Sequence, residues 1–250
     1  MLLGAAEADA VFNKRRYAFF LTILHLERVI SMQLGGLMGG IYKISDMVMK
    51  LAYLNILWFL GVLSGLVVFG IMPATVSLFS VIRGWILNDD EMTIHKKFIE
   101  TYKKDFFPSN ILGLIILFVG YGFFINYQFL GSMNEESSLT LIILVGNILV
   151  AILLGIFLLF IFPIYVHFDM SLLKKIKLSV MLGIIYPHIT LVFIITVFLF
   201  CLLFTFIPAL IFFFSVSGVA YCLMGIYMKK INDIAEKYNR KEQVLKESFE

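Results

Sequence analysis

The residues with the clearest chemical potential are three ionisable side chains beside long apolar runs: His167, Asp169 and His188. Imidazole nitrogens and carboxylates bind metal ions and transfer protons, so the three together form a candidate metal or proton site. Ligands on one helix need a spacing such as His-x-x-x-His, which brings both side chains onto one face. No such spacing with a second His or Glu supports the site. We therefore interpret these residues as structural and expect no metal ion.

Nucleophilic chemistry has one weak match, the Ser-x-x-Lys pattern of Ser171 and Lys174. A lysine that acts as a base must be desolvated, whereas Lys174 lies in a solvated cluster of basic residues. The sequence has no Gly-rich phosphate loop, His-Glu-x-x-His motif or Cys-x-x-Cys pair. Its two cysteines, Cys201 and Cys222, stand inside apolar runs, where a thiol behaves as a small hydrophobe. We therefore expect a protein that is not an enzyme and has no cofactor.

Uncharged polar residues inside the apolar runs are a further group of candidates. They are Asn55, Asn126, Gln128 and Asn147. In lipid such groups pair with neighbouring helices, and each hydrogen bond contributes about 0.6 kcal/mol on average. The alternative is that Asn55 and Asn147 line a path for a small solute. We favour interhelical contacts over ligand binding.

Two pairs of small residues can bring helices close together, Gly61-x-x-x-Gly65 and Ala151-x-x-x-Gly155. Small residues four positions apart let two helix backbones approach each other. The pattern does not distinguish packing within one chain from a dimer, so the oligomeric state stays open.

A broken apolar stretch supplies the last candidates. Residues 70–75 contain Pro73 and Thr75 and end the first apolar run. Residues 76–87, which include Arg83 and Trp85, are amphipathic but too short to cross a bilayer. Tryptophan favours the headgroup region, and an arginine side chain can extend to a phosphate. We expect a helix along the inner membrane interface, although interrupted helices also line substrate sites in transporters.

The overall composition identifies the solvent around these residues. Of 250 residues, 61% are apolar and 15% are charged, and the mean hydropathy is +0.96. Because a soluble domain has about a quarter of charged residues, this composition excludes a water-soluble globular protein. A net charge of +3 is too small for a nucleic-acid surface, so we expect no nucleic-acid partner. The lipid bilayer is the expected surrounding of an integral membrane protein.

Five stretches are long enough to cross the hydrocarbon core, which takes about 20 apolar residues. They are residues 51–72, 111–130, 139–166, 188–207 and 209–228. Continuous apolar runs favour helices, because membrane strands alternate in polarity. The predicted fold class is all-α, a transmembrane bundle of about five helices with interfacial amphipathic helices. Pro208 alone separates the fourth run from the fifth, which makes that boundary the least defined.

The basic residues predict the orientation of the bundle. Lys and Arg concentrate at residues 83–104, 174–177 and 229–246, all on one side of a five-helix path. The opposite loop, residues 131–138, carries Glu135 and Glu136 and no basic residue. Because basic loops stay in the cytoplasm, we predict a multi-pass protein of the bacterial cell membrane with a cytoplasmic C-terminus.

The N-terminal region does not fit this orientation. Residues 1–50 carry six basic groups, of which two remain if the chain starts at Met38. The apolar run at residues 17–24 is too short to span and has no signal-peptide cleavage site. We hypothesise that residues 1–37 are a non-native extension, that residues 38–228 form the transmembrane domain and that residues 229–250 form a cytoplasmic tail. If residues 1–37 are instead a native cytoplasmic extension, the orientation changes; intact-mass analysis of native protein decides between the two.

Three charged segments outside the spans have apolar stripes at helical spacing. They are residues 91–107, 168–182 and 229–250. In the first, an apolar residue recurs every four positions at Ile94, Phe98, Tyr102 and Phe106. Such a helix can lie on anionic lipid or dock onto a partner protein, and periodicity and charge do not choose between these two.

Specific residues in the first half of the chain resemble a known family. They are residues 38–42, 51–55 with Trp58, 70–75, Arg83 with Trp85, and 102–106. This pattern resembles the YesL family of small bacterial membrane proteins, a domain of unknown function. Beyond residue 111 the resemblance lies mainly in the order of the helices. Members of that family are often encoded beside genes for carbohydrate uptake and polysaccharide breakdown, and the family supplies no catalytic residues to carry over.

The resemblance and the basic amphipathic segments together favour an accessory or regulatory partner of a carbohydrate uptake system, in contact with a sugar permease subunit. The alternative is an independent small-solute transporter or channel whose path includes Asn55, Asn147 and the break at Pro73. A proton-coupled carrier normally needs an ionisable residue at membrane depth. The five predicted spans contain no Lys, Arg, Asp or Glu, which favours the accessory role.

Overall fold

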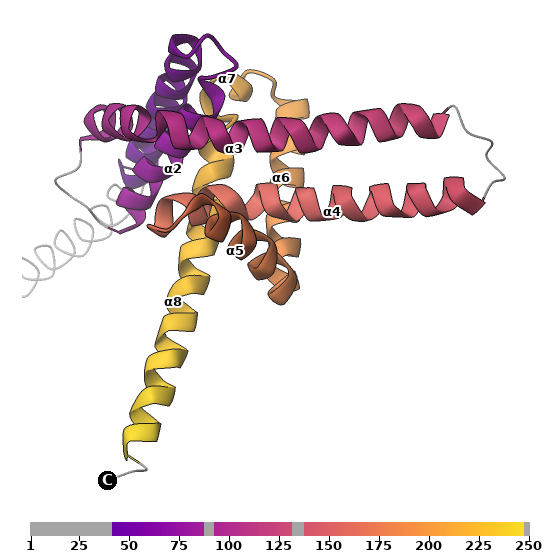
Figure 1. Ribbon diagram of the computed structural model, residues 1–250. Coiled ribbons are helices and arrows are strands. Elements are labelled where there is room, and N and C mark those ends of the chain that lie inside the picture. The colour runs from indigo at the N-terminus through magenta and orange to yellow at the C-terminus, as the bar shows by residue number, and fades with distance from the viewer. Residues whose placement is uncertain (1–41, 88–92, 132–137, 248–250) are drawn as a thin grey trace, which may run out of the picture. The chain divides into compact units, whose positions relative to one another are not determined.

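The computed structural model describes residues 42–87, 93–131 and 138–247, and each regular element in these ranges is a helix (Figure 1). The all-α prediction is therefore confirmed. The chain divides into two compact units, residues 1–50 and 51–250. In the described part of the first unit, the Lys50 ammonium pairs with the Asp46 carboxylate at 2.7 Å. The hypothesis of a start at Met38 concerns residues outside the described ranges.

Four described helices are long and apolar enough to cross a membrane. They are Tyr42–Ser64, α3 (Ile94–Gly131), residues Leu139–His167 of α4 (Ser138–His167), and α6 (Pro187–Phe206). Each overlaps one of the predicted spans, so the chain is an all-helical membrane protein. The 38 residues of α3 form one helix with Pro108 inside it, which joins the predicted amphipathic segment and the second span into a single element.

The fifth predicted span, residues 209–228, is not one helix. The short helix α7 (Leu210–Phe214) is followed by a break at Ser215 and Val216, and α8 (Ser217–Glu247) begins after it. The apolar part of α8 ends at Met228 and is about 18 Å long at 1.5 Å per residue, which is less than the hydrocarbon thickness. The prediction of a fifth continuous transmembrane helix is therefore wrong, because hydropathy does not register the break.

Although it is short, the apolar part of α8 returns the chain to the level where α6 begins. A Cβ on Gly218, at the start of α8, would lie 2.9 Å from the ring of Phe200 in α6. Farther along, Lys230 Nζ lies 3.5 Å from Nε2 of His188. The two helices therefore run antiparallel, side by side in Figure 1. Lys230 consequently lies at the same end as the junction between α5 (Leu172–Ile185) and α6.

A tight turn at residues 65–70 ends the first helix and leads into α2 (Ile71–Ile86). A Cβ on Gly65 would overlap the Cα of Gly70, so this close approach requires glycine. Leu66 and Val67 adopt φ values of 54° and 66°, a left-handed conformation that costs about 1–2 kcal/mol per residue. The first span therefore ends before residue 72, the end predicted from hydropathy.

The buried centre of residues 51–250 is α2. Ten of its 16 residues are buried, and it packs against α3, α4 and α8. Leu78 and Ile82 belong to the main core cluster together with Phe160 and Met224. Because protein covers α2 on several sides, residues 76–87 do not form the lipid-exposed surface helix that their amphipathic pattern predicts. Amphipathicity gave the helix correctly but could not show which neighbours cover its faces.

The chain itself covers two of the three predicted amphipathic stripes. In α3, Phe98 is buried, and the Tyr102 hydroxyl donates to the Gly61 carbonyl at 2.8 Å. In α5, Leu172 and Ile176 pack against a second core cluster. The chain's own helices therefore cover at least part of both stripes, a third possibility beside the two predicted alternatives of lipid and a partner protein. Their apolar residues fix how α3 and α5 are rotated about their axes.

Candidate functional site

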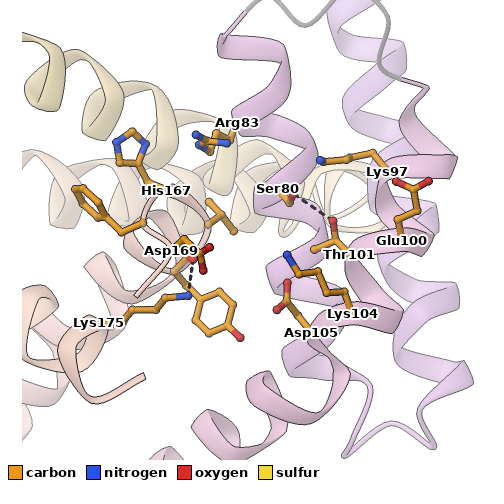
Figure 2. A pocket seen from close by; sticks show the side chains of 13 residues that line it. Ser80, Arg83, Lys97, Glu100, Thr101, Lys104, Asp105, His167, Asp169 and Lys175 are labelled. Carbon is orange, nitrogen blue, oxygen red and sulfur yellow. Dashed lines mark hydrogen bonds between the residues drawn. The ribbon is translucent and has the colours of Figure 1, made fainter. Parts of the chain in front are cut away.

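A polar pocket of about 420 Å³ lies where α2, α3, α4 and α5 meet (Figure 2). Its lining residues are Ser80 and Arg83 from α2, Lys97, Glu100, Thr101, Lys104 and Asp105 from α3, residues 165–169 at and after the end of α4, and Lys175 from α5. Basic side chains from three helices thus share one cavity with the carboxylates of Glu100, Asp105 and Asp169.

Helical spacing explains why α3 contributes so many polar groups. Its five lining residues stand at positions i, i+3, i+4, i+7 and i+8 from Lys97, which places them on one face of the helix. Phe98 and Tyr102 lie on the neighbouring face and pack against Gly61. This contact fixes the rotation of α3 and directs its polar face into the pocket.

Lys175 is held in the pocket by Tyr165. Its ammonium donates to the Tyr165 carbonyl at 3.0 Å and lies 3.8 Å from the centroid of the Tyr165 ring. Burial lowers the pKa of Lys175 below its ordinary value, and the carboxylates of Asp105 and Asp169 only partly oppose that effect. A partly buried ammonium has three donors, so Lys175 can still donate to an anionic oxygen.

Two buried polar atoms of the pocket have no hydrogen-bond partner among the described residues. Arg83 Nε and His167 Nδ1 are buried there without a hydrogen bond. Within the described ranges, the ion pairs shorter than 4.0 Å join residues four apart on one helix, and none lies in the pocket. Leaving a buried donor unpaired is costly, so the arrangement favours a bound ligand or water that supplies acceptors.

Asn55, a predicted candidate, lies elsewhere and holds the break between α7 and α8. Its Nδ2 donates to the Phe212 carbonyl at 2.8 Å and to Ser215 Oγ at 3.4 Å. Its Oδ1 accepts the backbone N–H groups of Val216 and Ser217, each at 3.2 Å. These four bonds use every donor and acceptor position of the amide, and the side chain is fully buried. Asn55 therefore makes an interhelical contact and is closed to a solute.

Other predicted candidates also lie in packing contacts. Pro73 is buried in the first turn of α2, where its missing N–H costs little. Thr75 Oγ1 donates to the Ile71 carbonyl at 2.7 Å and accepts from Trp58 Nε1 at 3.1 Å. Trp85 packs against the main core cluster. Arg83, in contrast to these residues, lines the polar pocket.

The remaining candidates are separated in space. Asn147 lines an apolar groove between α3 and α4, so it and Asn55 contact different elements. His167 and Asp169 line the polar pocket, whereas His188 contacts Lys230. The three residues of the candidate metal or proton site therefore do not lie together. Among the described residues, no three His, Cys, Asp or Glu side chains are grouped so that they could hold a metal ion.

Sequence reasoning missed most of the pocket. Its lysines at 97, 104 and 175 lie in the charged amphipathic segments 91–107 and 168–182, for which the sequence predicts no ligand site. The available signal was the polar stripe of α3, in which Glu100, Thr101 and Asp105 accompany two of these lysines at helical spacing. That signal identifies a polar face, but the sequence does not show that α4 and α5 close over it.

The fold and the site define an all-helical membrane protein with a buried short helix and a polar pocket beside it. A family model described as "Protein of unknown function, DUF624" matches residues 51–127. Over 196 residues the chain is 37% identical to the uncharacterized protein YteU of Bacillus subtilis (strain 168), covering 78% of this chain and 86% of that protein. The chain therefore belongs to the DUF624 family, in agreement with its predicted resemblance to YesL.

Two further relatives of the same organism support this membership. The uncharacterized protein YesL is 32% identical over 153 residues, which cover 61% of this chain and 71% of YesL. The uncharacterized protein YesV is 32% identical over 151 residues, which cover 60% of this chain and 72% of YesV. No solved structure matches the chain at a significant level.

Proposed function

We propose that this chain is a non-catalytic accessory or regulatory subunit of a carbohydrate uptake system in the bacterial cell membrane. In this proposal a sugar permease subunit is its partner, and the C-terminal part of α8 lies in the cytoplasm, where it contacts that partner. The relation to the YesL family supports carbohydrate uptake as the process. The exposed part of α8 supports a role through contact with a partner protein.

The observation that carries the proposal is the extension of α8 beyond the core. Ile231 still packs against the main core cluster, but Tyr238 is 67% exposed, and the described side chains between them and after Tyr238 are mostly exposed. In Figure 1 the C-terminal half of the α8 ribbon extends away from the other labelled helices. Two exposed pairs, Arg240 with Glu236 and Lys246 with Glu242, lie along it. Exposed pairs of this kind contribute little to stability. A long charged helix that leaves its own core is suited to contact a second protein.

The alternative of an independent transporter is less well supported. Its predicted path required Asn55, Asn147 and the break at Pro73. The amide of Asn55 is fully engaged by the backbone around α7 and α8, and Pro73 is buried in α2. These contacts leave neither residue available to a solute, which favours the accessory role.

Removal of the α8 extension tests the proposal. A chain that ends after Asn232 keeps Ile231 and the core, so we expect it to reach the membrane at the level of the full chain. In a deletion strain, the full chain should restore uptake of the affected carbohydrate, and the truncated chain should not. Uptake is measured with labelled sugars across a panel of carbohydrates. Normal uptake of every sugar in the deletion strain, or full restoration by the truncated chain, contradicts the proposal.

Site-specific photocrosslinking identifies the partner directly. A photoreactive residue at Tyr238 should capture a permease subunit in native membranes. The matched control is the same residue at Leu117, which is exposed on the apolar half of α3 and should capture lipid. Capture of a permease subunit from both positions, or from neither, argues against docking through α8.

A further inference from the structure

The polar pocket between α2, α3, α4 and α5 carries an inference that is independent of the proposed accessory role. Three of its cations come from three different helices: Arg83 from α2, Lys104 from α3 and Lys175 from α5. Figure 2 shows them around one cavity. Cations that approach from several directions match a ligand whose oxygens are arranged tetrahedrally better than a planar carboxylate, which offers two oxygens in one plane.

The protein itself does not provide hydrogen-bond acceptors for all N–H donors of these cations. Arg83 Nε is buried without a partner among the described residues, and Lys175 donates one hydrogen bond, to the Tyr165 carbonyl. Nor does any carboxylate in the described ranges approach a pocket cation within ion-pair distance. Charge-assisted bonds to an anion would satisfy these donors, and such bonds are about twice as strong as neutral ones.

The three carboxylates of the pocket restrict the rest of the ligand. Glu100, Asp105 and Asp169 would repel a bare anion, but they accept hydrogen bonds from hydroxyl or ammonium groups. The volume of about 420 Å³ is also larger than a single phosphate ion needs and lies in the usual range for small-ligand sites. Both observations favour a phosphate ester with a small polar group attached over free phosphate.

The place of the pocket along the helices is consistent with two sources of such an ester. Residues 165–167 close the apolar run of α4, and the α3 residues of the pocket precede the apolar part of that helix. The pocket thus lies at the level where apolar spans end, and basic pockets between membrane helices at this level bind lipid headgroups. A water-soluble phosphate ester can reach the same level from the aqueous side.

We propose that this pocket binds the phosphate group of a phosphate ester, held by Arg83, Lys104 and Lys175. The carboxylates around them accept hydrogen bonds from the polar group that the ester carries. The ester is the headgroup of an anionic phospholipid or a small soluble molecule, and in both the phosphate makes the same contacts.

The test uses the full chain in nanodiscs and two probes. Nanodiscs of phosphatidylcholine with and without phosphatidylglycerol report headgroup binding through the lipids that the protein retains in native mass spectrometry. Glycerol 3-phosphate, titrated calorimetrically into phosphatidylcholine nanodiscs, reports binding of a soluble ester. Retention of phosphatidylglycerol alone assigns the headgroup as ligand, and binding of glycerol 3-phosphate assigns the soluble ester.

A pair of neighbouring lysines provides the matched variants. Lys104 lines the pocket, whereas Lys103 does not, and both side chains are exposed, so neither substitution should impair folding. We expect Lys104→Gln to weaken binding of the active probe by about tenfold and Lys103→Gln to leave it unchanged. Arg83→Gln should weaken it at least as much, and Lys104→Gln keeps the test valid if Arg83→Gln misfolds. Equal affinities for the two lysine variants, or failure of both probes to bind the parent chain, would overturn the proposal.

Discussion

Replacement of Asn55 by leucine is expected to lower the free energy of unfolding by about 2–4 kcal/mol. The substitution removes the partner of the Phe212 carbonyl and of the Val216 and Ser217 N–H groups, all at the break between α7 and α8. The lower end of the range applies if the unfolded chain finds other partners in the lipid, as it does for many membrane hydrogen bonds. Denaturant titration of the purified full chain in detergent, followed by circular dichroism, measures the change.

The control for this prediction is a second asparagine in an apolar helix. Asn126 in α3 is exposed, so Asn126→Leu should change the free energy of unfolding by no more than about 0.5 kcal/mol. Hydrogen exchange adds a local readout, because in Asn55→Leu the amides of Val216 and Ser217 should lose protection before those of α3. An unfolding midpoint equal to that of the parent chain, with unchanged protection, would show that Asn55 does not hold the break.

The position of Asn55 also shows what hydropathy can and cannot predict in this chain. Long apolar runs gave the helices at residues 111–130, 139–166 and 188–207, because one physical requirement, the thickness of the bilayer, sets their length. Residues 209–228 satisfy the same requirement, and yet the helix breaks at Ser215. That break is stabilised by an amide about 160 positions earlier in the chain. A hydropathy window around residues 209–228 does not include so distant a partner.

The same limit applies to the candidate site. The sequence predicts Arg83 as a candidate because it lies in the short amphipathic stretch after Pro73. The surrounding expected for it there is the membrane interface. The polar stripe of α3 is visible in the sequence as a face, and Lys175 as part of a basic cluster. Which face meets which depends on apolar contacts such as those of Phe98 and Tyr102 with Gly61. The sequence therefore predicts the polar face of each helix separately. That these faces meet in one pocket depends on tertiary packing, which the sequence pattern does not show.

Substitution of Gly183 in α5 is the second change for which we expect a large loss in the free energy of unfolding. A Cβ at this position would overlap the Cγ2 methyl of Ile156 in α4, and it would lie 3.4 Å from the ring of Phe160. Because both neighbours are part of the packing between α4 and α5, Gly183→Ala forces these helices apart. We expect a loss of about 1–3 kcal/mol in the free energy of unfolding, measured by the same titration. Gly183→Leu should be worse, since its added volume cannot be accommodated by a rotation of Ile156.

The matched control is Gly155, one helical position away from Ile156. The sequence pattern Ala151-x-x-x-Gly155 marks this glycine as a point of close helix approach, whereas no pattern marks Gly183. The structure reverses that ranking, because nothing lies within 4 Å of a Cβ placed on Gly155. Gly155→Ala should therefore leave stability unchanged or raise it by up to about 1 kcal/mol through better helix propensity. If Gly155→Ala destabilises the protein and Gly183→Ala does not, close packing occurs at Gly155 through a second copy of the chain, and the α4–α5 contact is looser than the structure places it.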